Sequence, residues 1–167
     1  MQVGGAIVDW KKFTAYAKSG GMTAEFPSGE DWVEDIKHSF GDSLTEYEVI
    51  STGFQLLRKK LTLVMRQQAD NTVGMFLQSE EGTGHQDIKS ESGAWFAALS
   101  PATCAKVAKD AGRLDYEALQ KGYDAVIAQL DKGTARKKRF VPYLKEYMAG
   151  ICRAAEEKKG FALWLSC

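Results

Sequence analysis

Hydrophobic residues recur along this chain at spacings that distinguish predicted helices from predicted strands. The first apolar stretch, VGGAIV at 3–8, is short and rich in β-branched residues, which predicts a strand. A helix is expected directly after it, because Asp9 can cap a helix start and Gly20 and Gly21 can end it. The apolar residues of this helix recur at helical spacing: Trp10, Phe13 and Ala17.

The next periodic segment, 28–41, also predicts a helix. Ser28 or Gly29 can cap it, and acidic residues fill its first turn, where the helix dipole favours them. Its apolar face is formed by Trp32, Val33, Ile36 and Phe40.

The segment from 43 to 79 is consistent with two interpretations. One is a helix over about 43–59 followed by a hairpin that pairs 60–67 with 72–79, because both of these stretches alternate between apolar and polar residues. The other is one helix that continues to Gln68, which Gly53 in its interior disfavours. We favour the hairpin, since "ADN" between the two stretches is typical of a turn.

The second half of the chain predicts three helices and a strand. Ser100 can cap the first helix, which Pro101 opens and Gly112 follows. The second starts on Asp115, and the third has Pro142 at its start. The final stretch, FALWLSC, is apolar at successive positions and so predicts a buried strand. Together these elements predict an α+β fold: a single domain, 1–167, in which a small, mainly antiparallel sheet packs with about five or six helices.

Composition favours a soluble protein of the cytoplasm. Hydrophobic residues make up 44% of the chain and charged residues 26%, and no apolar run approaches the ~18 residues of a membrane span. The start of the chain lacks the features of a signal peptide. The cysteines are Cys104, Cys152 and Cys167, whose number and spacing indicate neither a disulfide framework nor a zinc site. We therefore predict no metal, no cofactor and no membrane partner.

Two segments of the second half carry a family resemblance. "ALSPATCAKVAKDAGRLDYEALQKGYD" and "YLKEYMAGICRAAEEKKGFALWLS" together resemble the C-terminal part of the YfbM-like family of uncharacterised bacterial proteins, over about 95–166. The N-terminal third departs from that family, because "EYEVISTGFQLLRKK" contains no histidine where the family has a helix rich in tryptophan and histidine. The resemblance implies an α+β fold and a bacterial source, but it carries over no activity and no catalytic residue.

The charges are unevenly distributed along the chain. Residues 1–100 carry nine Lys/Arg and fourteen Asp/Glu, a net charge of −5, whereas residues 101–167 carry thirteen and eight, a net charge of +5. The acids concentrate in 25–48, and on the predicted helix they repeat at i, i+4, where like charges repel. A sequence that tolerates this repulsion indicates a basic partner. The candidate binding residues are Glu30, Asp31, Glu34, Asp35, Glu46 and Glu48.

Three residues are weaker candidates for catalysis. His85 and Asp87 lie in the glycine loop "EEGTGHQD", where a carboxylate could orient a histidine for general acid–base chemistry. That loop lacks the lysine of a phosphate-binding loop, and a connector is the simpler interpretation. Cys104 lies in the first turn of a predicted helix, where a thiol can be activated, although a small residue packed in the core explains it equally well.

The leading functional hypothesis is therefore a non-enzymatic cytoplasmic binding protein. In its sharpest form it is an immunity-type inhibitor that blocks a basic toxin or nuclease through the acidic segment 25–48. The alternatives are a small hydrolase or transferase that uses His85 and Asp87, and a scaffold subunit of a larger assembly. Nucleic acid is a disfavoured partner, because the basic run 136–139 is short and stands alone.

Overall fold

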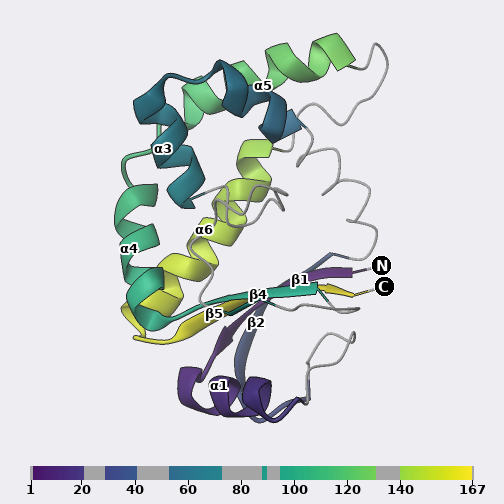
Figure 1. The fold of residues 1–167 in the computed structure, drawn as a ribbon, viewed down its shortest axis with the longest axis vertical. Coiled ribbons are helices and arrows are strands. Elements are labelled where there is room, and N and C mark those ends of the chain that lie inside the picture. The colour runs from purple at the N-terminus through teal and green to yellow at the C-terminus, as the bar shows by residue number, and fades with distance from the viewer. Residues whose placement is uncertain are drawn as a thin grey trace.

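The computed structural model describes residues 2–20, 29–40, 53–72, 88–89, 95–130 and 140–166 (Figure 1). Within these ranges the strands form one five-stranded sheet in the order β2-β1-β5-β4-β3, and each neighbouring pair is antiparallel. The strands are β1 (Gln2–Val8), β2 (Val33–Phe40), β3 (Ile88–Lys89), β4 (Trp95–Leu99) and β5 (Gly160–Ser166). The last strand of the chain therefore lies in the middle of the sheet, beside the first.

Helices lie on both faces of this sheet. Helix α1 (Trp10–Lys18) lies on one face, and the remaining helices lie on the other (Figure 1). Those are α3 (Leu63–Thr72), α4 (Pro101–Ala111), α5 (Tyr116–Leu130), α6 (Phe140–Glu156) and a helical segment over 53–60. The predicted α+β class, with a small antiparallel sheet and about six helices, is confirmed. None of the described helices is both long and apolar enough to cross a membrane.

Strand β5 contributes to the core on both faces of the sheet. Phe161 and Leu163 join the large cluster beneath α4, α5 and α6, whereas Ala162 and Trp164 join a smaller cluster beneath α1. Successive side chains of a strand point to opposite faces, so a central strand needs apolar residues at every position. This explains why FALWL has no alternating pattern.

Two glycines let helix α6 approach the sheet closely at Phe161. A Cβ atom on Gly5 of β1 or on Gly150 of α6 would lie 2.7 Å from the Phe161 ring. The ring, 1% exposed, therefore occupies space that any larger residue at either position would fill.

The helix starts follow the caps that the sequence predicts. A side-chain oxygen accepts a backbone N–H at the start of α1, α4 and α5, as an N-cap does. The distances are 3.1 Å from Lys12 N to Asp9 Oδ1, 3.3 Å from Thr103 N to Ser100 Oγ, and 2.9 Å from Ala118 N to Asp115 Oδ1.

The predicted helix over 28–41 is wrong, because Val33–Phe40 forms strand β2. This strand pairs with β1 through a register that shifts twice, so that the register skips Glu34 and Lys37. Each such bulge inserts one residue and breaks the period of two. Val33 and Ile36, which pair with Val8 and Ala6 on one face, are consequently three residues apart, and this spacing imitates a helix.

Both interpretations of the segment around Gly53–Gln68 also need correction. Residues 53–60 are helical, as the first interpretation expects, but the predicted strand over 60–67 is replaced by helix α3. The continuous helix is equally wrong, because Leu61 and Thr62 are not helical and interrupt it. Thr62 caps the second helix: its backbone carbonyl accepts from Arg66 N at 2.8 Å, and its Oγ1 accepts from Met65 N at 3.4 Å. The remaining predictions in this region, 43–52 and 73–79, lie outside the described residues.

Candidate interaction surfaces

The predicted acidic residues lie along a turn and a strand and do not share a helix face. Those that the structure describes, which we call the acidic strip, are Glu30, Asp31, Glu34 and Asp35. The first two belong to the turn before Trp32, and the other two belong to the beginning of β2. Glu46 and Glu48 lie outside the described residues. The i, i+4 repulsion expected for a helix therefore does not arise here.

Each carboxylate of the acidic strip contacts a group of the same chain. The contacts are Tyr16 Oη donating to Glu30 Oε1 at 3.4 Å, Lys12 Nζ to Asp31 Oδ2 at 3.6 Å, Arg153 Nη1 to Asp35 Oδ2 at 3.2 Å, and a short hydrogen bond from Lys159 Nζ to Glu34 Oε1. Arg153 and Lys159 come from the basic half of the chain. Part of the charge asymmetry of the sequence is thus compensated inside the folded molecule.

Three of the donor groups in these contacts have a raised pKa: Tyr16, Arg153 and Lys159. The hydrogen bond from Lys159 to Glu34 raises the pKa of the Lys159 ammonium. Burial raises the pKa of Tyr16, and the Glu30 charge raises it further. For Arg153 the hydrogen bond to Glu157 raises the pKa most, while Asp35 adds a smaller effect. Arg153 and Lys159 therefore stay protonated at neutral pH.

Of the three catalytic candidates, the structure describes only Cys104. Cys104 is fully buried, and its Sγ lies 3.7 Å from the carbonyl oxygen of Leu99. A thiol in that position packs as a core residue and is not exposed to a substrate in solution. His85 and Asp87 lie outside the described residues, and a catalytic role for them stays a prediction. Among the described residues no group of three or more His, Cys, Asp or Glu could hold a metal ion.

A rigid corner joins the helical segment 53–60 to α3. Arg58 binds Asp70 with two parallel hydrogen bonds, 2.7 Å from Nε to Oδ1 and 2.8 Å from Nη2 to Oδ2. Arg66 donates from Nε to the Arg58 carbonyl at 3.1 Å and from Nη2 to the Leu61 carbonyl at 3.3 Å. One arginine thus ties the two helices together, and the other satisfies carbonyls at the end of the first. We call residues 58–66 the basic corner.

The basic corner carries two exposed aliphatic side chains. Leu63 is 77% exposed and Val64 is 66% exposed, and these are the exposed large hydrophobic residues of the described structure. Both lie in the stretch 60–67, for which the alternation of apolar and polar residues predicted a strand. Thr62, a favourable N-cap residue before a helix-forming run, was the local signal that would have located the helix start.

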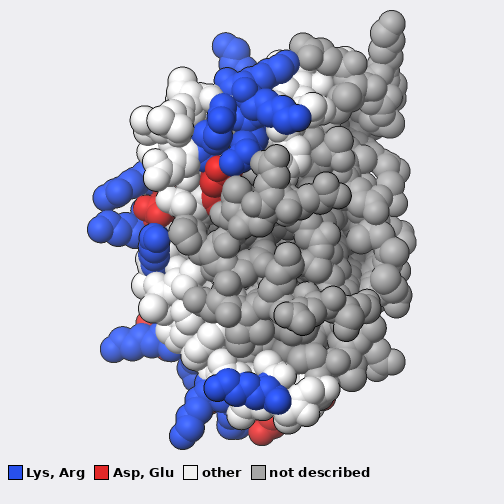
Figure 2. Space-filling view, in the orientation of Figure 1, with Lys and Arg blue, Asp and Glu red and all other residues white. Residues whose placement is uncertain are grey.

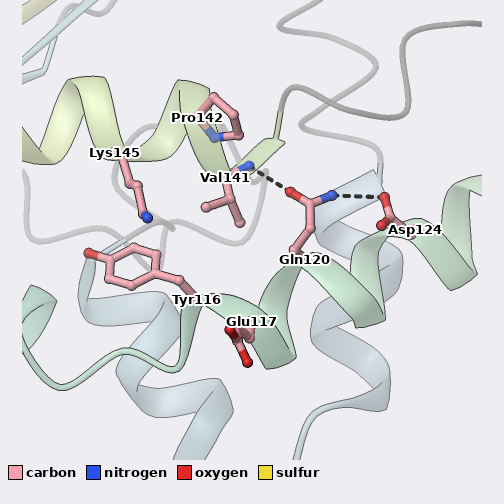
Figure 3. Close-up of a pocket in the computed structure, with 7 residues that line it drawn as sticks. All are labelled: Tyr116, Glu117, Gln120, Asp124, Val141, Pro142 and Lys145. Atoms are coloured by element: carbon pink, nitrogen blue, oxygen red, sulfur yellow. Dashed lines mark hydrogen bonds between the residues drawn. The ribbon is translucent and has the colours of Figure 1, made fainter.

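A shallow groove of about 470 Å³ lies between α5 and the first turns of α6 (Figure 3). It is lined by Tyr116, Glu117, Gln120, Asp124, Val141, Pro142 and Lys145. Gln120 is held at both ends, since its Nε2 donates to Asp124 Oδ1 at 2.8 Å and its Oε1 accepts from Val141 N at 3.0 Å (Figure 3). That backbone amide belongs to the first turn of α6, where helix N–H groups need outside acceptors.

The groove is lined by side chains of both charges, and contacts within the chain hold Tyr116 in place. Lys145 Nζ lies 5.3 Å from the centre of the Tyr116 ring, and Tyr116 Oη donates to the Ala111 carbonyl at 3.1 Å. Burial raises the pKa of the Tyr116 phenol, so the phenol stays neutral at physiological pH. One ammonium, two carboxylates and a fixed amide suit contact with a polar molecule, and the lining contains no paired nucleophile and base.

No family model, no curated protein and no solved structure matches this chain. The resemblance of residues 95–166 to the YfbM-like family therefore stays a prediction.

Proposed function

We propose that this protein is a non-enzymatic binding protein, and that another protein docks on its basic corner. The observation that carries the proposal is the exposure of Leu63 and Val64, 77% and 66%, next to each other at the start of α3. Single exposed apolar residues are common on protein surfaces, whereas an adjacent pair on a fixed support forms a small apolar patch that a partner can cover.

The support around this pair strengthens the proposal. The two hydrogen bonds from Arg58 to Asp70 and the two from Arg66 to backbone carbonyls hold the corner in one shape. A surface that is already ordered loses little conformational entropy when it binds. The two aliphatic side chains are therefore already held in position before a partner binds.

Site-specific photo-cross-linking tests this function. A photoreactive residue at position 63 is expected to capture one specific protein in the cells that make this chain, while the same residue at Lys18, on α1 at the other face of the sheet, captures none. The captured protein is then purified and its affinity measured. The double variant Leu63→Asp/Val64→Asp should weaken binding about tenfold or more, because it puts charge into a desolvated contact. Equal affinity of the double variant and the wild type would refute the corner as the docking surface.

The acidic strip supports a second candidate, an immunity-type inhibitor of a basic toxin or nuclease in a bacterial cytoplasm. The observation in its favour is that the Asp31 side chain is 79% exposed and its ion pair with Lys12 is long, at 3.6 Å. Exposed pairs of this kind contribute little, so a basic partner could replace Lys12.

The two candidates predict different effects of charge reversal in the acidic strip. Reversing Glu30 and Asp31 to lysine should abolish inhibition of a basic partner but leave docking on the basic corner unchanged. Glu34 and Asp35 are less suitable for this test, because they also bind Lys159 and Arg153.

A further inference from the structure

We infer that the partner of the basic corner presents carboxylates around an apolar hollow, and that Leu63 and Val64 enter that hollow. This inference rests on the proposed function and adds the chemistry of the partner. It follows from the charges that surround the two aliphatic side chains.

Basic side chains lie on one flank of the exposed pair. Lys59 and Lys60 are exposed at the end of the preceding helical segment, and Arg66 lies one turn further along α3. Figure 2 shows Lys and Arg side chains gathered over the top of the molecule, where segment 53–60 lies, with only a small acidic area below them. Within this corner, Asp70 is paired with Arg58.

More basic side chains lie on the other flank. Helix α4 packs against α3, and Lys106, Lys109 and Arg113 on and just after α4 are exposed. Figure 2 shows Lys and Arg side chains projecting along the edge where α4 lies, with smaller acidic areas among them. Residues three and four apart share a helix side, so these cations form a row beside the corner. The exposed aliphatic pair is therefore bordered by positive charge on both flanks.

The start of α3 adds to this positive potential. The N-terminal end of a helix carries partial positive charge, which acidic residues in the first turn commonly compensate. The first turn of α3 contains no acidic residue. Leu63 and Val64 thus project from the positive end of the helix, and a carboxylate that borders the hollow would meet both the lysines and the helix end.

Two features favour a protein over an anionic lipid surface. A lipid surface is fluid and gains little from a fixed arrangement of two side chains, whereas a protein hollow of matching shape does gain. The corner is fixed by four side-chain hydrogen bonds. In addition, two aliphatic side chains offer little apolar area to a membrane, on which even a single acyl chain binds only marginally and reversibly.

The test uses the protein captured through position 63 and measures its dissociation constant against salt and charge. Raising the salt concentration from about 0.05 to 0.5 M should weaken binding about tenfold or more, since screening acts on exposed charges. Lys59→Glu/Lys60→Glu should also weaken binding about tenfold, and Lys106→Glu/Lys109→Glu less. The matched control is Lys11→Glu/Lys18→Glu on α1, which carries the same charge change at the other face of the sheet and should leave affinity unchanged.

The outcomes separate this inference from the function on which it rests. If Leu63→Asp/Val64→Asp abolishes binding while salt and the lysine variants have no effect, the carboxylates inferred for the partner are refuted. The docking surface on the basic corner then stands. If the aspartate variants have no effect, both are refuted. Sedimentation with vesicles of phosphatidylcholine, with and without phosphatidylserine, covers the lipid alternative. Binding that requires phosphatidylserine and is lost in Leu63→Asp/Val64→Asp would overturn the inference of a protein partner.

Discussion

The acidic strip and the basic corner use charge in opposite ways. In the strip, each of the four carboxylates contacts a hydroxyl or a cation of the same chain. Two of these cations, Arg153 and Lys159, come from the distant basic half of the chain. In the corner, two arginines are used to build the support, while lysines and two aliphatic side chains face solvent. A dense run of charge in a sequence therefore does not by itself identify an exposed charged surface.

The largest effect is expected from a substitution that removes the support of the corner. A Cβ on Gly53 would lie 2.6 Å from Cε2 of Tyr123 and 2.8 Å from Cδ1 of Ile127, both of which are buried. Gly53→Val should therefore lower the free energy of unfolding by about 2–3 kcal/mol, because the core cannot shift around a larger residue without strain. Urea denaturation followed by circular dichroism measures this difference.

Two other glycines provide controls for that experiment. At Gly122 a Cβ would meet the flexible end of Leu57, at 2.6 Å from Cδ1, and at Gly29 it would meet nothing within 4 Å. Gly122→Ala should therefore cost much less than Gly53→Val, because the helix gains propensity while one side chain moves. Gly29→Ala should leave stability within about 0.5 kcal/mol of the wild type. Equal destabilisation by all three variants would contradict the packing argument.

A smaller loss of stability is expected when the two hydrogen bonds between Arg58 and Asp70 are broken. The side chains of Arg58 and Asp70 are 20% and 15% exposed, so either one would be poorly solvated if the other were replaced. Asp70→Asn should lower the free energy of unfolding by about 1–3 kcal/mol. It should also weaken binding of the captured protein if the corner must be rigid. Arg58→Lys keeps the charge but cannot form two parallel hydrogen bonds, and an unchanged stability in that variant would show that charge alone suffices.

The acidic strip should have a small effect on stability that disappears at alkaline pH. The folded protein raises the pKa of Lys159 above its ordinary 10.5, so the pair with Glu34 stabilises the fold below that pH. This contribution is lost as the pH rises through the raised pKa. Glu34→Gln should therefore be slightly less stable than the wild type at neutral pH, and the two should converge well above pH 10.5. A constant difference across this range, measured by thermal denaturation, would contradict the pairing.

The smallest effect on stability is expected at the exposed pair itself. Leu63→Ser and Val64→Ser should each change the free energy of unfolding by no more than about 0.5 kcal/mol, because the side chains already lie largely in water. Chemical denaturation of both variants beside the wild type measures this. A loss comparable to that of Gly53→Val would mean that the two side chains are buried in the folded protein in solution, and the surface would have to be reconsidered.

The parts of the fold that were predictable from sequence depend on neighbouring residues. Asp9, Ser100 and Asp115 start helices because each side chain binds a backbone N–H three residues later. The last strand, FALWL, was also identified correctly, since only a position covered on both faces tolerates continuous apolar residues. The candidate surface was missed for the opposite reason: a pattern of apolar residues indicates burial, whereas Leu63 and Val64 are exposed.

The sequence alone determined the element types where capping and periodicity agree, and it determined the α+β class. Tertiary structure decided the identity of β2, because two bulges and pairing with β1 override the helical spacing of Val33, Ile36 and Phe40. It also decided which charges face solvent, because Arg153 and Lys159 reach the acidic strip only when α6 and β5 pack near β1 and β2. Local hydrogen bonds act over three or four residues, so they can be read from sequence, whereas partners more than a hundred residues apart are joined only by the fold.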